Sequence, residues 1–223
     1  MGIETKDGET KEIETRVKRQ FSSLFITLVS VLIGLVFADL VSEARARMVL
    51  WPLTWETMRT WGQIAAMGAS ALTAWVVYAH IGASRQRVPV LADSLVAFCT
   101  PIPLLVGNSL VGQKAIWPWF AYASFYLAVS LFTSLWQIRL VRADAELAAA
   151  FSRRFLATGF FAIFLAGIPA FAAFAWIDYE GWMPLWLETA IAFAPVPAAL
   201  LCMQLFFQDW HRAIKEADDD AAS

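Results

Sequence analysis

The stretch "FSSLFITLVSVLIGLVFADL" (residues 21–40) is almost continuously apolar and follows a basic flank. About 20 such residues, at about 1.5 Å each, cross a hydrocarbon core about 30 Å thick, so runs of this length are typical of membrane-spanning helices. The whole chain has the same character: 59% of its 223 residues are hydrophobic and 16% are charged. A soluble domain has about 25% charged residues.

Six apolar segments of this kind follow one another, over residues 20–42, 61–82, 88–108, 116–138, 155–177 and 185–207. Backbone groups in lipid must be satisfied within each segment, so helices are expected. The sequence therefore predicts an all-α, polytopic membrane protein with six transmembrane helices. Residues 20–208 form the predicted membrane domain, between a charged tail (1–19), helical only near its end, and an acidic tail (209–223).

The distribution of basic residues predicts that both chain ends are cytoplasmic. Of the 17 Lys and Arg residues, only Arg45, Arg47, Arg59 and Lys114 would then lie outside. Bacterial inner-membrane proteins hold most Lys and Arg on the cytoplasmic side, and they place Trp at the interfaces. The outer interface is accordingly expected to hold Trp51, Trp55, Trp61, Trp117, Trp119, Trp176, Trp182 and Trp186.

Two connections carry their own pattern. Residues 42–61, "SEARARMVLWPLTWETMRTW", mix Arg with Met, Leu and Trp, which predicts a short amphipathic helix along the outer surface. Residues 139–154 are rich in Ala and Leu and contain neither Gly nor Pro. We expect them to extend the fourth and fifth helices into the cytoplasm.

Two carboxylates fall within predicted spans, Asp93 in the third and Glu188 at the start of the sixth. An ionisable group inside a membrane is costly unless it is paired or hydrated, which makes both candidates for an ion path. A simpler explanation is also open for each. Asp93 could pair with His80, Arg85 or Arg87, and Glu188 could be a hydrated interfacial residue.

Polar residues also form stripes. On the first span, Ser23, Thr27, Ser30 and Gly34 share one helical face. Such stripes can line a hydrated path, or they can let helices pack closely and bond to one another. The fourth span has a similar face, made of Tyr122, Tyr126, Ser130, Thr133 and Gln137.

Two proline pairs, Pro101 with Pro103 and Pro195 with Pro197, are expected to break or kink the third and sixth spans. They belong to similar phrases, "DSLVAFCTPIP" (93–103) and "ETAIAFAPVP" (188–197). Interrupted helices at matching places in two inverted halves indicate a transporter-type site near mid-membrane. The match is short, and chance similarity is the open alternative.

The first half of the chain resembles the bacterial relatives of the lysosomal potassium channel family. The shared features are a basic flank, a Phe-Ser pair opening the first helix, a Trp followed by His closing the second, and a proline-bearing third span. Ser23 stands where that family has Asp. The residues that carry the resemblance are Arg16, Arg19, Phe21, Ser22, Trp75 and His80.

This resemblance implies a homotetramer whose first helices line a cation pore, with potassium as the family's ion. The constriction would be formed by Leu28, Leu32 and Leu35, which share one face of the first helix.

The expected function is therefore conduction or transport of a small cation across the bacterial inner membrane. The alternative is a non-transporting membrane subunit that packs against protein partners. The only histidines are His80 and His211, and neither belongs to a metal-ligating or catalytic motif, so we predict no enzyme activity, metal or cofactor. The expected partners are the lipid bilayer and further copies of the chain, and not nucleic acid.

Overall fold

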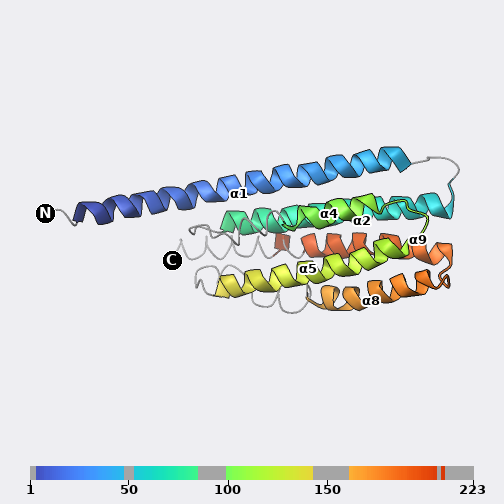
Figure 1. Ribbon diagram of the computed structural model, residues 1–223. Coiled ribbons are helices and arrows are strands. Elements are labelled where there is room, and N and C mark those ends of the chain that lie inside the picture. Colours follow the sequence, from blue (N-terminus) through green and yellow to red (C-terminus); the bar gives the residue numbers. More distant parts are fainter. Residues whose placement is uncertain (1–3, 48–52, 85–98, 143–160, 205–206, 209–223) are drawn as a thin grey trace.

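The computed structural model describes residues 4–47, 53–84, 99–142, 161–204 and 207–208, and these residues form helices joined by short turns and loops (Figure 1). No described residue belongs to a β-strand, so the predicted all-α class is confirmed. The helices are α1 (Glu4–Arg47), α2 (Trp55–Ser84), α4 (Pro101–Ser109), α5 (Trp117–Arg142), α8 (Phe161–Tyr179) and α9 (Leu185–Phe193).

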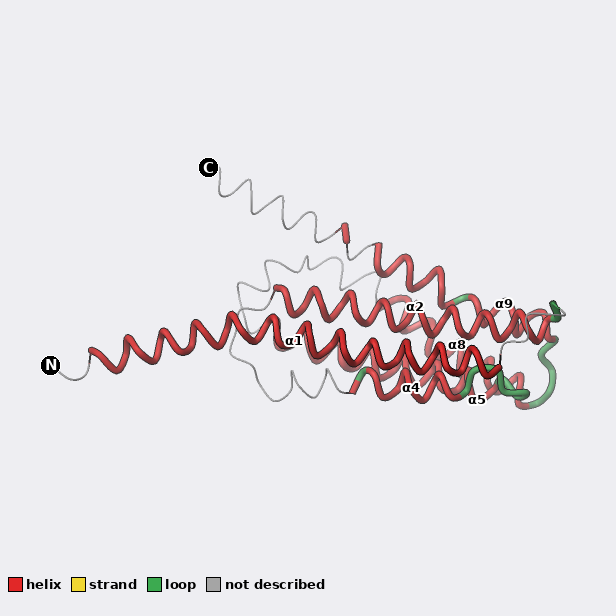
Figure 2. Tube along the Cα trace, turned by 90° about the horizontal axis from the view of Figure 1, so that it is seen from above, coloured by secondary structure: helices red, strands yellow, loops and turns green. Residues whose placement is uncertain are grey.

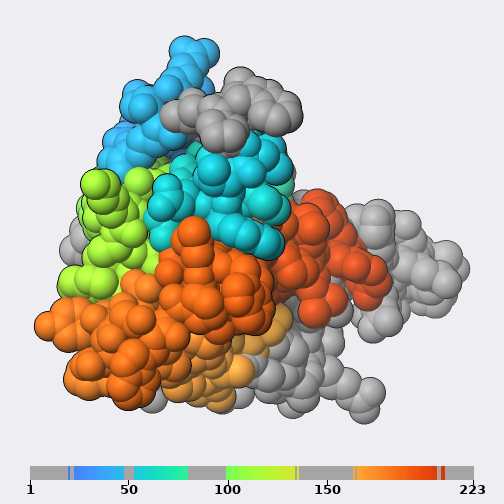
Figure 3. All heavy atoms as spheres, turned by 90° about the vertical axis from the view of Figure 1, so that its right-hand side faces the viewer, coloured from blue at the N-terminus to red at the C-terminus, as the bar shows by residue number. Residues whose placement is uncertain are grey.

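Successive helices run in alternating directions along one long axis (Figures 1 and 2). The C-terminal end of α1, the N-terminal end of α2 and the turn between α8 and α9 therefore gather at one end of the bundle. The opposite part of α1 extends well beyond the other helices (Figure 2). In the end-on view of Figure 3, the start of α2 lies between the end of α1 and the turn between α8 and α9.

Two helical stretches among the described residues are long and apolar enough to cross a membrane, Ser23–Arg47 and Leu185–Gln204. A shorter apolar helix covers Leu165–Tyr179. In α5 the run is diluted by Trp, Tyr and Ser side chains, whose polar atoms lower its hydropathy although its 26 residues are long enough. Length and composition thus identify two candidate spans among the described residues, and the six-span topology stays a prediction.

The connection between the first two helices differs from the prediction. Residues 42–47 continue α1 and residues 55–61 open α2, so the described parts of 42–61 belong to these two helices and not to a separate surface helix. Within the predicted tail (1–19) the helix extends further than expected, because α1 is helical from Glu4 onward as one helix of 44 residues. At the other connection, α5 continues to Arg142 as expected, and residues 143–160 lie outside the described part.

The core is built from one face of α1 against α2, α4 and α5. On α1 the buried residues recur every three or four positions, which is the period of a helix face. They are Phe25, Val29, Ile33, Val36 and Leu40. The remaining helices pair mainly as α5 with α8 and α2 with α9.

A glycine in α4 permits the closest approach in this core. Gly107 is buried, and a Cβ atom at this position would overlap the ring of Tyr122 and the methyl group of Met67. By contrast, a Cβ at Gly68 would meet Leu40 at an ordinary contact distance of 3.7 Å.

We therefore expect Gly107→Ala to lower the free energy of unfolding by about 1–3 kcal/mol, since an extra methyl forces the packed ring aside. The matched control, Gly68→Ala, should be neutral or slightly stabilising because alanine favours the helix. Unfolding of both variants in mixed micelles measures the difference. Equal stability of the two would contradict the packing described for Gly107.

Candidate functional site

Two helix breaks lie near the middle of the bundle, and each precedes a proline. Thr100 is a turn residue, and α4 begins directly after it at Pro101. In the same way α9 ends at Phe193, Ala194 is a turn residue, and a further helical segment covers 195–204. Proline fits the first turn of a helix, but inside a helix it removes one hydrogen bond and clashes with the preceding turn, which kinks or breaks the helix. In α8 the helix continues through Pro169.

Both breaks border one cavity of about 250 Å³. Its wall is formed by the C-terminal half of α2, the start of α4, the middle of α5, α8 and the segment 194–202. Residues from both aligned proline phrases therefore face the same space. The lining residues that flank the breaks are Thr100, Pro103, Ala194 and Pro195.

Hydroxyl groups supply most of the polar atoms in this wall. The wall includes Ser70, Thr73, Tyr78, Tyr126, Ser130 and Thr133, together with Thr100 and the thiol of Cys202. None of the described lining residues is charged.

The hydroxyls of the wall are held by local hydrogen bonds. Thr73 donates to the carbonyl of Ala69 at 2.8 Å, within its own helix. The Tyr78 and Thr100 hydroxyl oxygens lie 2.6 Å apart and share a hydrogen bond between α2 and the first break. These bonds fix the hydroxyl oxygens at separate places around the cavity.

The predicted polar stripe of α5 faces this cavity. Tyr126, Ser130 and Thr133 line it, while Tyr122 is buried one turn earlier. The Tyr122 hydroxyl donates to the carbonyl of Pro103, and its ring stacks on Tyr126 with centroids 6.2 Å apart. The stripe thus both packs against α4 and lines the open space.

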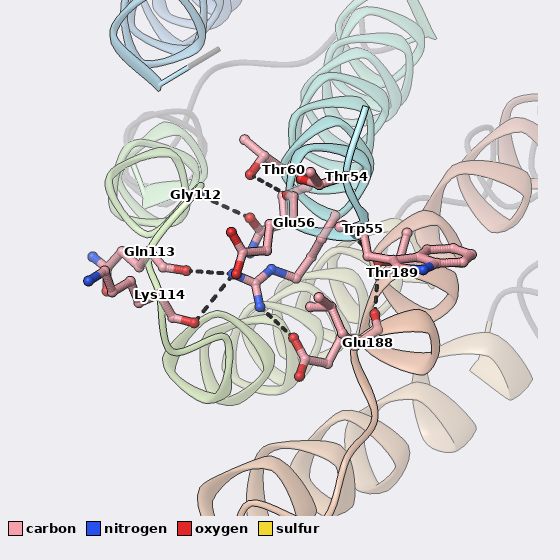
Figure 4. Close-up of polar contacts among 12 residues, drawn as sticks. Thr54, Trp55, Glu56, Thr60, Gly112, Gln113, Lys114, Glu188 and Thr189 are labelled. Carbon is pink, nitrogen blue, oxygen red and sulfur yellow. Dashed lines mark hydrogen bonds and ion pairs between the residues drawn. The ribbon is translucent and has the colours of Figure 1, made fainter. Parts of the chain in front are cut away.

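Glu188 lies outside the cavity, near the end of the bundle, and is paired. Its side chain is buried, and its Oε2 atom lies 2.5 Å from Nη1 of Arg59. The other terminal nitrogen of Arg59 donates to the carbonyls of Gln113 at 3.1 Å and Lys114 at 3.3 Å, so three segments meet at one guanidinium (Figure 4). Next to Glu188, Thr189 donates to the carbonyl of Trp55 at 3.1 Å.

The pairing of Glu188 satisfies the requirement that a buried charge find a counter-charge. Glu188 is therefore neither the hydrated interfacial carboxylate nor an unpaired ion ligand. Arg59, expected in an outer connection, is buried in α2 instead.

Further buried polar groups at the same end were not identified from the sequence. Gln63, one turn after Arg59, accepts a hydrogen bond from the N–H of Gly112 at 2.9 Å. Asn108 donates to the Val36 carbonyl at 3.1 Å and to Asp39 at 3.0 Å. One sequence feature could have identified these groups: Asp39, Gln63 and Asn108 are polar residues inside otherwise apolar helices.

The three leucines that the channel resemblance assigns to the pore constriction do not line this cavity. Leu28 packs partly against the core, Leu32 is half-buried and Leu35 is 58% exposed. α1 contributes no described residue to the cavity wall. Among the described members of the predicted tryptophan belt, one differs from the prediction, because Trp119 is buried in the core rather than at the surface. Trp51 lies outside the described residues.

Some candidate residues cannot be placed. Asp93 lies outside the described residues, as do the side chains of His80 and Gln137. Within the described part, no group of three or more His, Cys, Asp or Glu side chains is arranged to hold a metal ion.

No family model matches the chain, and no curated protein or solved structure is significantly similar to it.

The Arg59–Glu188 pair generates a stability prediction. Arg59→Met leaves a buried carboxylate without its counter-charge, and we expect a loss of about 3–5 kcal/mol in the free energy of unfolding. The double variant Arg59→Met/Glu188→Met should recover most of that loss, because apolar residues of similar size can replace a buried pair. Unfolding in mixed micelles measures both.

The matched control is Arg45→Met, since Arg45 is exposed near the end of α1. This change should alter stability by less than about 1 kcal/mol. If the double variant were as unstable as Arg59→Met alone, the stability of this end of the bundle would not depend on the ion pair.

Proposed function

We propose that the protein is a bacterial inner-membrane protein of six spans with both ends in the cytoplasm. Large apolar side chains are exposed on every described helix, which water would disfavour and lipid would not. They include Val31 (α1), Leu72 (α2), Ile102 (α4), Phe132 (α5), Leu165 (α8) and Trp186 (α9). The alternating helix directions fit an even number of crossings with both ends on one side.

Tryptophans support the orientation of the bundle. At the end that holds Arg59 and Glu188, the exposed indoles are those of Trp55, Trp61, Trp117, Trp176, Trp182 and Trp186. A membrane–water interface is the usual place for such a ring of amphipathic side chains. We assign this end to the outer face.

We further propose that the cavity at the two breaks is a site through which a small cation crosses the membrane. The observation that carries this proposal is that both proline breaks and the polar stripe of α5 meet at one cavity. Each proline removes one backbone hydrogen bond of the helix, and carbonyls freed in this way at membrane depth are tolerated where they line a cavity. Interrupted helices hold the ion and substrate sites of many transporters. Hydroxyl oxygens can replace part of a cation's hydration shell.

Flux through liposomes tests this proposal. Ala198 lines the cavity, and Ala198→Phe should fill it and reduce cation flux at least tenfold while the protein remains folded. Ala173 on α8 is exposed, so Ala173→Phe is the matched control and should leave flux unchanged. Undiminished flux in Ala198→Phe would contradict a path through the cavity.

The channel resemblance makes a different prediction for the same assay. If first helices of several copies line the pore, Leu28→Ala and Leu32→Ala should change the flux and Ala198→Phe should not. The absence of flux in the wild-type protein, together with a protein partner that co-purifies, would favour the non-transporting subunit.

A specific observation favours assembly through α1. Residues on its free side recur with spacings of 4 and 3 in strict alternation, which is the repeat of a coiled coil. All members from Gln20 onward are exposed, and a Cβ at Gly34 would meet nothing within 4 Å. The set is Ile13, Val17, Gln20, Leu24, Thr27, Val31, Gly34, Ala38 and Val41.

We propose that this face of α1 packs in parallel against α1 of a second copy. The repeat begins in the N-terminal part of α1. This part of the helix extends beyond the bundle (Figure 2), where lipid contact alone does not explain the repeat. Small residues at positions 34 and 38 let two membrane helices approach closely.

Cross-linking in native membranes tests this assembly. In a chain carrying Cys99→Ser and Cys202→Ala, Gly34→Cys should give an oxidation-dependent dimer on denaturing gels. Val36→Cys is the control and should not, because Val36 is fully buried within its own subunit. Equal yields at the two positions, or none at either, would contradict the proposed contact.

A further inference from the structure

The walls of the cavity are more apolar and aromatic than a metal-ion site requires. Besides its hydroxyls, the cavity is lined by the rings of Tyr78, Tyr126 and Phe171. Aliphatic side chains complete the wall, among them Val77, Leu127 and Ile163.

The size of the cavity also differs from that of a metal-ion site. An ion such as Ca²⁺ needs about six to eight oxygens within about 2.6 Å, a shell that encloses roughly 70 Å³. The cavity has about 250 Å³, and its hydroxyls come from α2, the first break and α5 rather than from one point. Because Tyr78 and Thr100 are hydrogen-bonded to one another and Thr73 to its own helix, these groups are not free to converge.

From these features we infer that the cavity binds an organic monocation of the quaternary-ammonium type, with choline as a representative. This inference rests on the proposed cation path and names its substrate class. A quaternary ammonium has no N–H to satisfy and spreads its charge over methyl groups, so it needs no ring of oxygens. Its methyl groups suit the aliphatic wall, and aromatic rings attract its charge through their quadrupoles.

The hydroxyl of such a ligand also has partners. Ser130 and Thr133 lie one turn apart along the α5 stripe, and Thr133 already donates to the carbonyl of Ser130 at 3.0 Å. The Thr133 oxygen can therefore accept a hydrogen bond from the ligand. The wall thus offers rings for the charged end and hydroxyls for the polar end.

Binding to the purified full chain in detergent tests the inference directly. We expect choline to bind, measured by calorimetry or by a concentration-dependent rise in melting temperature. The neutral carbon isostere 3,3-dimethyl-1-butanol has the same shape without the charge and should bind at least tenfold more weakly. Equal binding of the two would overturn the cationic class, and no binding of choline would overturn the inference as a whole.

Two substitutions of Tyr126 distinguish the contribution of its aromatic face from that of its hydroxyl group. Tyr126→Phe keeps the aromatic face and should retain choline affinity within about threefold, whereas Tyr126→Leu should lose roughly tenfold, the scale of one desolvated cation–π contact. Tyr179→Leu is the control, because Tyr179 is 63% exposed at the outer end and should have no effect. Equal affinity of the Phe and Leu variants would contradict a role for the ring.

The flux assay distinguishes this inference from the proposed function. Choline binding that Ala198→Phe abolishes, without any cation flux, would leave the site in place and refute transport. Potassium flux that Ala198→Phe abolishes, without choline binding, would support transport and refute the organic substrate.

Discussion

The structure depends on the inability of proline to donate a backbone hydrogen bond. Pro101 begins α4 after the turn residue Thr100, and Pro195 begins a further helical segment after the turn residue Ala194. The helical hydrogen bonding is interrupted at both places, although both turn residues keep right-handed helical dihedral angles. Pro103 and Pro197 follow two residues later and leave the carbonyls of Cys99 and Phe193 without the usual donor four residues on. Carbonyls freed in this way need other partners, such as neighbouring hydroxyls, water or an ion. The cavity lies where the two interrupted regions meet.

The end of the bundle that holds Arg59 is constructed differently. Side chains there bridge from one helix to the backbone of another: Arg47 to the carbonyls of Ser109 and Val111, Gln63 to the N–H of Gly112, and Arg59 to the loop before α5. Each bridge satisfies carbonyls or N–H groups that a helix end leaves without partners. The sequence pattern of residues 42–61 suggested a connecting helix at this end. In the described part, long polar side chains join the helices there.

The sequence was sufficient for the features that depend on local pattern. The apolar segments predicted over 116–138 and 155–177 contain most of α5 and α8, and the helix breaks follow from the proline pairs, because both depend only on neighbouring residues. The partner of Glu188 could not be predicted in this way. Arg59 lies 129 positions away from Glu188 in the sequence. Because it is charged, it was expected in an outer connection.

The cavity illustrates the same limit. The stripe of α5 could be recognised as one helical face, but whether it packed or lined an open space depended on which helices faced it. The answer involves α2, α8 and the segment after Ala194, which no local pattern joins. Asp39 and Asn108 were missed for a related reason, because they lie 69 positions apart in the sequence and only the fold brings them into hydrogen-bonding distance.

The end of the bundle that holds Arg59 and Glu188 and the part around the cavity are held together differently. This difference bears on how a solute would reach the cavity. At the outer end, an ion pair and side-chain bonds join α1, α2, the end of α4 and α9, so separating these helices would break several charge-assisted hydrogen bonds at once. At the level of the cavity several hydroxyl bonds stay within one helix, as in Thr73 and Thr133, and separating the helices there leaves these bonds intact. Hydrogen bonds such as Tyr78–Thr100 cross between helices there, but no ion pair among the described residues does. The lower cost of opening is therefore at and below the breaks, on the side that the proposed orientation assigns to the cytoplasm. A solute that enters from that side does not require the helices at the other end to separate. The Arg59–Glu188 ion pair holds those helices together.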